Sequence, residues 1–176
     1  MAEPDHEPTG PESADFGAWY GAVYPRLAAA LTVVGRDREL ARDAAAEACA
    51  RALERWARVQ AMNAPDAWTY RVGLNVLRRL QRRAALERRV LRRLDTAGER
   101  APAELDPGLW AAVRALPLRQ REAIVLRYVL DLEQHEIAEA MGVSPGTVAS
   151  TLHAARARLH AALGGTDPDD QLSEVE

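Results

Sequence analysis

The chain has 176 residues, enough for one medium domain or two small ones, and 48% of them are hydrophobic. Alanine and leucine dominate the apolar set, which favours helices over sheet. The net charge is −3, but residues 1–15 and 167–176 carry five acids each and no base, so the chain between them holds all 23 basic residues against 16 acids. Every base is an arginine.

These bulk properties exclude several classes of protein. A single cysteine rules out an internal disulfide and suits a reducing compartment. The acidic, Pro-rich start does not resemble a signal peptide, and no long apolar run predicts membrane insertion. We therefore expect a cytoplasmic, all-α protein with disordered acidic tails at residues 1–14 and 164–176.

Residues 15–83 are predicted to form a first helical domain. An amphipathic helix begins near Phe16 and is ended by Gly35, and Asp37 can cap a second helix that reaches about Val59. The residues of the second helix expected to face the core are Leu40, Ala44, Ala48, Leu53 and Trp56.

A third helix is predicted to start near Pro65, and its body is strongly basic. Residues 71–93 contain nine arginines and one acid, Glu87. A solvated helix face usually interleaves acids with bases, so this bias favours contact with nucleic acid. The segment 84–106 that follows is predicted to be a flexible linker.

Residues 107–163 are predicted to form a second domain that contains a helix-turn-helix. Gly142 can take the left-handed conformation that ends one helix, Ser144 can cap the next, and Pro145 suits its first position. Such a second helix enters the major groove of DNA. The alternative is an ordinary helical hairpin in an all-α core.

The sequence shows no constellation that predicts catalysis, a metal site or a cofactor. Cys49 lies mid-helix among alanines and is expected to be a buried, inert thiol. His135, His153 and His160 are expected on the surface, with His153 the one that could contact a DNA groove.

Taken together, the two blocks resemble the compact bacterial sigma factors of the extracytoplasmic-function group, which have only the domains called region 2 and region 4. The residues of the first block that carry the resemblance are Arg42 to Ala48, Arg51 to Leu53, Trp56, and Ala67 to Val72 leading to Asn75. Those of the second are Leu116-Pro117, Arg121-Glu122, Val125 to Arg127, Glu136 to Ala138, Gly142 to Ser144, Gly146 to Val148 and Ala155-Arg156.

The resemblance implies three binding surfaces. Contact with the clamp helices of core RNA polymerase is implied for Leu40, Asp43, Glu47 and Arg51. Capture of the −10 strand as it melts is implied for Met62, Asn63 and Ala64 in a loop, and for Arg71, Asn75, Arg78 and Arg79 on the third helix. Reading of the −35 duplex is implied for Ser144, Thr147, Ser150, Thr151, His153, Arg156 and Arg158. The implied partners are core polymerase (clamp helices and flap region), promoter DNA and an anti-sigma factor packed between the domains.

The chain departs from the family pattern at several positions. Ala46 stands where glutamine is common, and Ala149, Thr151 and Ala154 are uncharged where the recognition helix often carries bases. Fewer phosphate contacts predict weak DNA binding by region 4 alone. Two other hypotheses stay open: a stand-alone helix-turn-helix regulator acting without polymerase, and a sigma-like protein that only sequesters polymerase.

Overall fold

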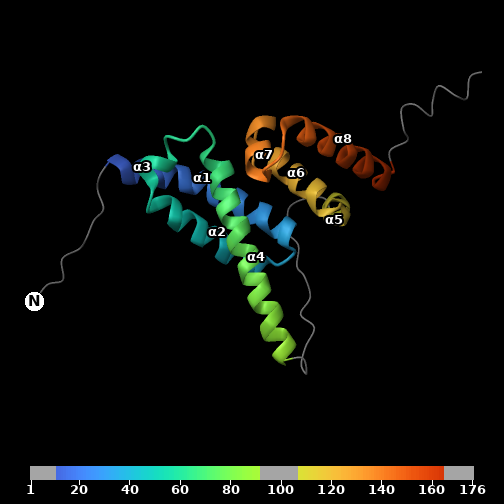
Figure 1. Cartoon of the computed structure of the whole chain (residues 1–176), viewed down its shortest axis with the longest axis horizontal. Coiled ribbons are helices and arrows are strands. Elements are labelled where there is room, and N and C mark those ends of the chain that lie inside the picture. Colours follow the sequence, from blue (N-terminus) through green and yellow to red (C-terminus); the bar gives the residue numbers. More distant parts are fainter. Residues whose placement is uncertain (1–10, 92–106, 165–176) are drawn as a thin grey trace, which may run out of the picture.

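The computed structural model describes residues 11–91 and 107–164, and within them the side chains of 15–86 and 108–164. This part of the chain holds eight helices and no strand (Figure 1). Their bounds are α1 Pro11–Gly35, α2 Arg38–Leu53, α3 Trp56–Val59, α4 Pro65–Leu91, α5 Pro107–Ala115, α6 Leu118–Tyr128, α7 Gln134–Met141 and α8 Pro145–Ala162. The all-α prediction is confirmed. The tails at 1–10 and 165–176 and the linker stretch 92–106 lie outside the described residues.

The N-terminal half is built on α1, α2 and α4, which pack against one another. The face of α2 that meets its neighbours consists almost entirely of small side chains: Ala41, Ala44, Ala45, Ala48, Cys49 and Ala52. Gly73 of α4 lies opposite, and a Cβ built on it would come within 2.9 Å of Leu31 Cδ1 and 3.5 Å of Ala48 Cβ. Small residues on both sides therefore let the three helix backbones approach closely.

Several predicted boundaries in this half were wrong. The first helix begins at Pro11, inside the predicted tail. The second helix ends at Leu53 and not near Val59, because the chain forms a tight turn in which the Arg55 N–H donates to the Ala52 carbonyl. A separate short helix, α3, then carries Trp56 inward, whereas Leu53, predicted to face the core, is 53% exposed.

The basic helix is longer than its predicted domain. It runs to Leu91, so the first eight residues of the predicted linker 84–106 are helical. Residues 84–91, which read AALERRVL, are mostly good helix formers and include no Gly or Pro to stop the helix.

The C-terminal half contains the predicted helix-turn-helix, α7 and α8. Gly142 ends α7 in the left-handed conformation (φ 66°, ψ 41°), and Ser144 Oγ accepts the Thr147 N–H at 3.1 Å as the N-cap of α8. Glu133 and Glu136 add a capping box at the start of α7. Ile137, Ala138, Val148 and Leu152 are buried between the two helices and α6. These contacts confirm the predicted caps and turn.

The two halves lie against each other. Helices α5 and α6 pack on α1, and α7 packs on α4, so buried residues of both halves form one continuous apolar cluster (Figure 1). A smaller cluster of Trp56, Val59 and Ala52 lies at the α3 end, covered by Phe16, Trp19, Met62 and Trp68. Trp56 therefore faces the core as predicted, and Trp19 and Trp68 pack against it.

Gly73→Val tests the close crossing of α4 over α1 and α2. The added methyls would push against Leu31 and Ala48, so we expect a loss of about 1–3 kcal/mol in the free energy of unfolding by urea titration. Gly21→Val is the matched control, since a Cβ on Gly21 meets nothing within 4 Å. Equal stability of the two variants would contradict the close packing.

Candidate polymerase-binding and DNA-binding surfaces

The outer face of α2 carries the residues implied for polymerase contact. Asp43 is exposed, and Leu40, Glu47 and Arg51 are half-buried. The Glu47 carboxylate is already engaged: Arg51 donates to Oε1 at 2.5 Å one helical turn away, and Arg79 of α4 donates to both oxygens at 2.9 and 2.7 Å. The α2 surface is thus tied directly to the basic helix beside it.

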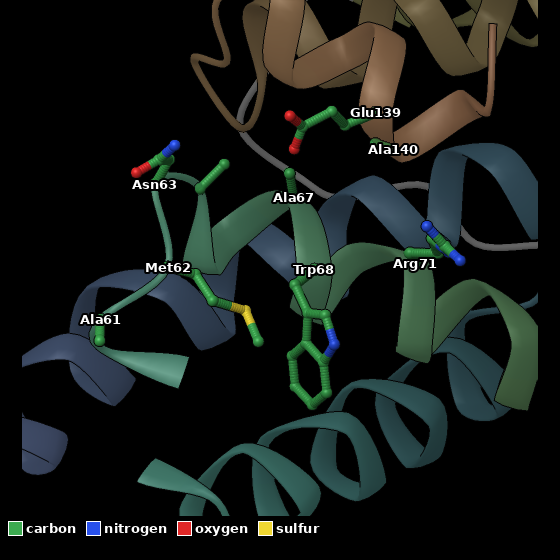
Figure 2. Close-up of a pocket in the computed structure, with 9 residues that line it drawn as sticks. Ala61, Met62, Asn63, Ala67, Trp68, Arg71, Glu139 and Ala140 are labelled. Atoms are coloured by element: carbon green, nitrogen blue, oxygen red, sulfur yellow. The ribbon is translucent and has the colours of Figure 1, made fainter. Parts of the chain in front are cut away.

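The loop between α3 and α4 lines a pocket together with α4. Met62, Asn63, Trp68 and Arg71 form one side of it (Figure 2). Ala64, implied as a strand contact, also lines the pocket, but only 7% of it is exposed, so little of its surface is available to a strand. Asn63 and Arg71 bring an amide and a guanidinium to this recess, groups that can hydrogen-bond a nucleotide, whereas Met62 and Trp68 also pack against the small cluster around Trp56.

The far wall of this pocket comes from the other half of the chain. Glu139 and Ala140 of α7 face the loop and the start of α4, as Figure 2 shows. Glu139 is exposed and acidic, so it presents negative charge to the recess.

The four implied strand contacts of α4 are exposed but differ in their partners. Arg78 Nη2 is 2.9 Å from Glu122 Oε1 of α6, and Arg79 is held by Glu47. Arg71 and Asn75 lie on the same helix at the level of the pocket and one turn beyond it.

The implied −35 contacts gather on α8. All are exposed except Thr151, which is half-buried and donates its hydroxyl to the Thr147 carbonyl at 2.6 Å. Ser150 bonds the same carbonyl at 3.0 Å. Arg156 Nε donates to the hydroxyl of Tyr128 at 2.9 Å and its guanidinium lies 6.0 Å from that ring's centroid. Tyr128 fixes the direction of Arg156, and its position outside the helix-turn-helix left no pattern by which sequence alone could identify it.

A buried polar cluster between the halves was also missed. Glu122 is 1% exposed, yet it is paired with Arg78 and, at 3.5 Å, with Arg119. Burial raises the pKa of its carboxyl, against the opposing influence of these arginines and Arg121. Beside it, Tyr70 is 1% exposed and its hydroxyl makes no hydrogen bond. Tyr70, Arg78, Arg121 and Glu122 were each noted in the sequence, but no pattern there predicted that they would meet.

Nothing in the described part of the chain suggests a metal centre. No group of three or more His, Cys, Asp or Glu side chains gathers there, and His135, His153 and His160 are exposed, as expected. Among those same residues, no helix is both long and apolar enough to cross a membrane.

Comparison with known proteins agrees with this arrangement. Residues 108–159, which span α5 to most of α8, match the family model for sigma-70, region 4. The chain is 33% identical over 142 residues to the RNA polymerase sigma-E factor of Streptomyces coelicolor, covering 77% of this chain and 78% of the relative. The chain belongs to the sigma-70 family. Together with its sigma-E relatives this match is consistent with the extracytoplasmic-function group, and the chain is a sigma factor, a family that is not catalytic.

Other relatives support the same assignment. The sigma-E factor of Streptomyces antibioticus is 34% identical, again over 77% of both chains. Among solved structures, CnrH in complex with the cytosolic domain of CnrY matches with a TM-score of 0.58 at 25% identity, covering 88% of this chain and 91% of that one. The sigma factor RpoE of Bartonella quintana, solved with the anti-sigma factor NepR, shares the fold with a TM-score of 0.66 at 24% identity, over 85% and 96% of the two chains.

Cys49 offers a test of the packing of region 2. It is 1% exposed, and burial, followed by the charge of Asp66, raises its thiol pKa to about 11. Because the thiolate is the reactive form, we expect almost no reaction with an aromatic disulfide reagent near neutral pH, and faster reaction as pH approaches that value. Full labelling should need denaturant; rapid labelling of the native protein would show that α2 opens readily.

Proposed function

We propose that this sigma factor binds core RNA polymerase through the outer face of α2 and captures the melted −10 strand at the pocket beside it. The supporting observation is that the outer face of α2 and the basic face of α4 meet where Arg79 Nη2 donates to both carboxylate oxygens of Glu47. One small domain thereby presents a charged helix face for a protein beside a helix whose exposed arginines suit a single strand. Clamp helices are the proposed partner of Leu40, Asp43, Glu47 and Arg51.

For region 4, we propose that α8 reads the −35 duplex in the major groove while the domain is tethered to polymerase near the flap. Ser144, Thr147 and Ser150 stand at the N-terminal end of α8, where recognition helices contact base edges. Arg156 and Arg158 follow on exposed positions and suit phosphate. With Ala149 and Ala154 uncharged, most of the affinity is expected from the tether.

Two further points belong to the proposal. The Bartonella quintana neighbour is held by an anti-sigma factor, and a protein inhibitor of that kind is expected here too. Action on polymerase places the protein in the cytoplasm. The stand-alone regulator is not favoured, because the sigma-E relatives match along 142 residues rather than over the helix-turn-helix alone.

Asp43→Arg tests polymerase binding. Reversing an exposed charge on the α2 face puts like charges at the proposed contact, so we expect loss of co-elution with sigma-free core polymerase on a sizing column. Asp15→Arg makes the same change at an exposed position on α1 and should co-elute like the parent chain. If the parent elutes alone as a dimer, the stand-alone regulator becomes the better account.

Arg71→Ala tests strand capture. On a promoter found by run-off transcription, it should reduce permanganate reactivity of −10 thymines by tenfold or more, the equivalent of a lost charge-assisted hydrogen bond of about 1.5–3 kcal/mol. Arg58→Ala, at an exposed position of α3, is the control for the loss of one positive charge. Equal opening by both variants would remove Arg71 from the strand-binding set.

A further inference from the structure

Two side chains of region 4 form a composite anion-binding site where the end of α6 meets the second half of α8. Tyr128 is the last residue of α6, and its hydroxyl accepts a hydrogen bond from Arg156 of α8. We propose that Tyr128 and Arg156 together bind one phosphate of the −35 duplex, with Tyr128 both a phosphate ligand and the residue that positions Arg156. This inference rests on the proposed contact of α8 with DNA and deepens it.

The contacts of Arg156 leave the outer end of its side chain available. Its Nε donates to the Tyr128 hydroxyl at 2.9 Å, and its guanidinium carbon lies 6.0 Å from the centroid of that ring. Among the described residues, Arg156 makes no other hydrogen bond or ion pair. The two terminal nitrogens of the guanidinium can therefore donate to an incoming ligand, and arginine holds phosphate through such donors.

The Tyr128 hydroxyl can add a donor of its own. A phenolic hydroxyl accepts through its oxygen and donates through its proton. The oxygen already accepts the Arg156 N–H, and the proton has no acceptor in the described part of the chain. A charged donor on the oxygen also polarises the hydroxyl, which strengthens the bond that it donates. A phosphate placed beside the two side chains would thus receive hydrogen bonds from both.

Both members of the pair are accessible to a ligand. Tyr128 is 60% exposed, and Arg156 is exposed as well. Exposed contacts between a ring and a cation, or between surface polar groups, stabilise a fold only weakly. The pair is therefore a poor fastener between α6 and α8, whereas its open surface suits a phosphate.

The two arginines of α8 project from different flanks of the helix. The buried stripe of α8 consists of Val148, Leu152 and Ala155. At about 100° per residue, Arg156 and Arg158 lie about 200° apart around the helix axis. A helix in the major groove has a phosphate backbone on each side, so the two arginines would approach different backbones. Tyr128 positions the arginine on the side of α6.

The scarcity of charge on α8 makes each of these contacts measurable. Arg156 and Arg158 are the only Lys or Arg residues between Pro145 and Ala162. Each phosphate that a protein neutralises adds about −0.9 to the slope of log affinity against log salt concentration. Loss of one phosphate contact should therefore change the salt dependence of DNA binding by a definite step.

The test measures the affinity of holoenzyme, formed with the full chain, for a promoter fragment found by run-off transcription at several salt concentrations. Tyr128→Leu changes no charge, yet it should reduce the magnitude of the salt slope almost as much as Arg156→Gln, by about 0.9, because an unpositioned guanidinium loses its phosphate. Tyr128→Phe keeps the ring and removes the hydroxyl. It should weaken binding about three- to tenfold, the effect of one lost hydrogen bond.

Double variants and a matched control separate positioning from a general effect. Tyr128→Leu should add nothing to Arg156→Gln, whereas its effect on the slope should add to that of Arg158→Gln. Tyr20→Phe removes a hydroxyl from an exposed ring of α1 and should bind like the parent chain. Thermal melting confirms that each variant is folded.

The contrary results are distinct. An unchanged salt slope in Tyr128→Leu would overturn the proposal, and so would an effect that adds fully to that of Arg156→Gln. If Tyr128→Leu does not fold, Tyr128→Phe decides, since parental affinity in that variant would overturn the phosphate bond of the hydroxyl.

Replacement of the −35 sequence distinguishes failure of the proposed function from failure of this inference. Equal affinity of the parent holoenzyme for the fragment with and without its −35 sequence would count against base reading by α8. The salt slope reports phosphate contacts on any sequence, so the Tyr128→Leu measurement would still decide the phosphate site.

Discussion

The carboxylate of Glu122 is the group around which the two domains are arranged. It is almost fully withdrawn from water, a position that strongly disfavours the charged form unless cations surround it. Arg119 and Arg121 come from its own helix, and Arg78 comes from the other domain. Removing one partner of a buried pair typically costs about 3–5 kcal/mol, whereas exposed pairs contribute about 0–1 kcal/mol. The Arg78–Glu122 pair joins a half-exposed side chain to a buried one, so its contribution is expected between these two ranges.

A second carboxylate links the two proposed functions of region 2. Glu47 stands on the outer face of α2, and its carboxylate oxygens accept hydrogen bonds from Arg79 of α4 and from Arg51 of its own helix. A partner that binds the Glu47 carboxylate would compete with Arg79 for its two oxygens. Both side chains of the Arg79–Glu47 pair are partly exposed to water, so the pair contributes little free energy. A partner that binds Glu47 is therefore expected to change the proposed strand binding by Arg79 only slightly.

Much of the architecture could be predicted from local chemistry. The caps at Asp37 and Ser144, the left-handed Gly142 and the three- and four-residue apolar spacing each depend on a few neighbouring residues, and the structure contains them all. The family pattern added the domain roles. The prediction that Leu53 faces the core was wrong. Leu53 fits an apolar helical stripe, but the turn that follows it places Trp56 in the core and leaves Leu53 exposed.

The candidate site was predictable only in part for the same reason. The family resemblance implied DNA contacts for Arg78 and Arg156, but their partners Glu122 and Tyr128 lie 44 and 28 residues away in the chain. Pairing at such separation depends on how helices pack, which no single-sequence period encodes. The assignment of polymerase and DNA contacts stays a prediction for every residue of the three surfaces.

The alanine face of α2 has a consequence for how this protein can diverge. Its inner side tolerates little beyond Ala, Gly or Cys, since α1 and α4 leave no room for added side-chain volume. Its outer side bears no such limit, because residues such as Arg42, Asp43 and Ala46 point to solvent. Substitutions on this helix are thus confined to one face, and that face, the proposed polymerase contact, can change its charge and shape without repacking the domain.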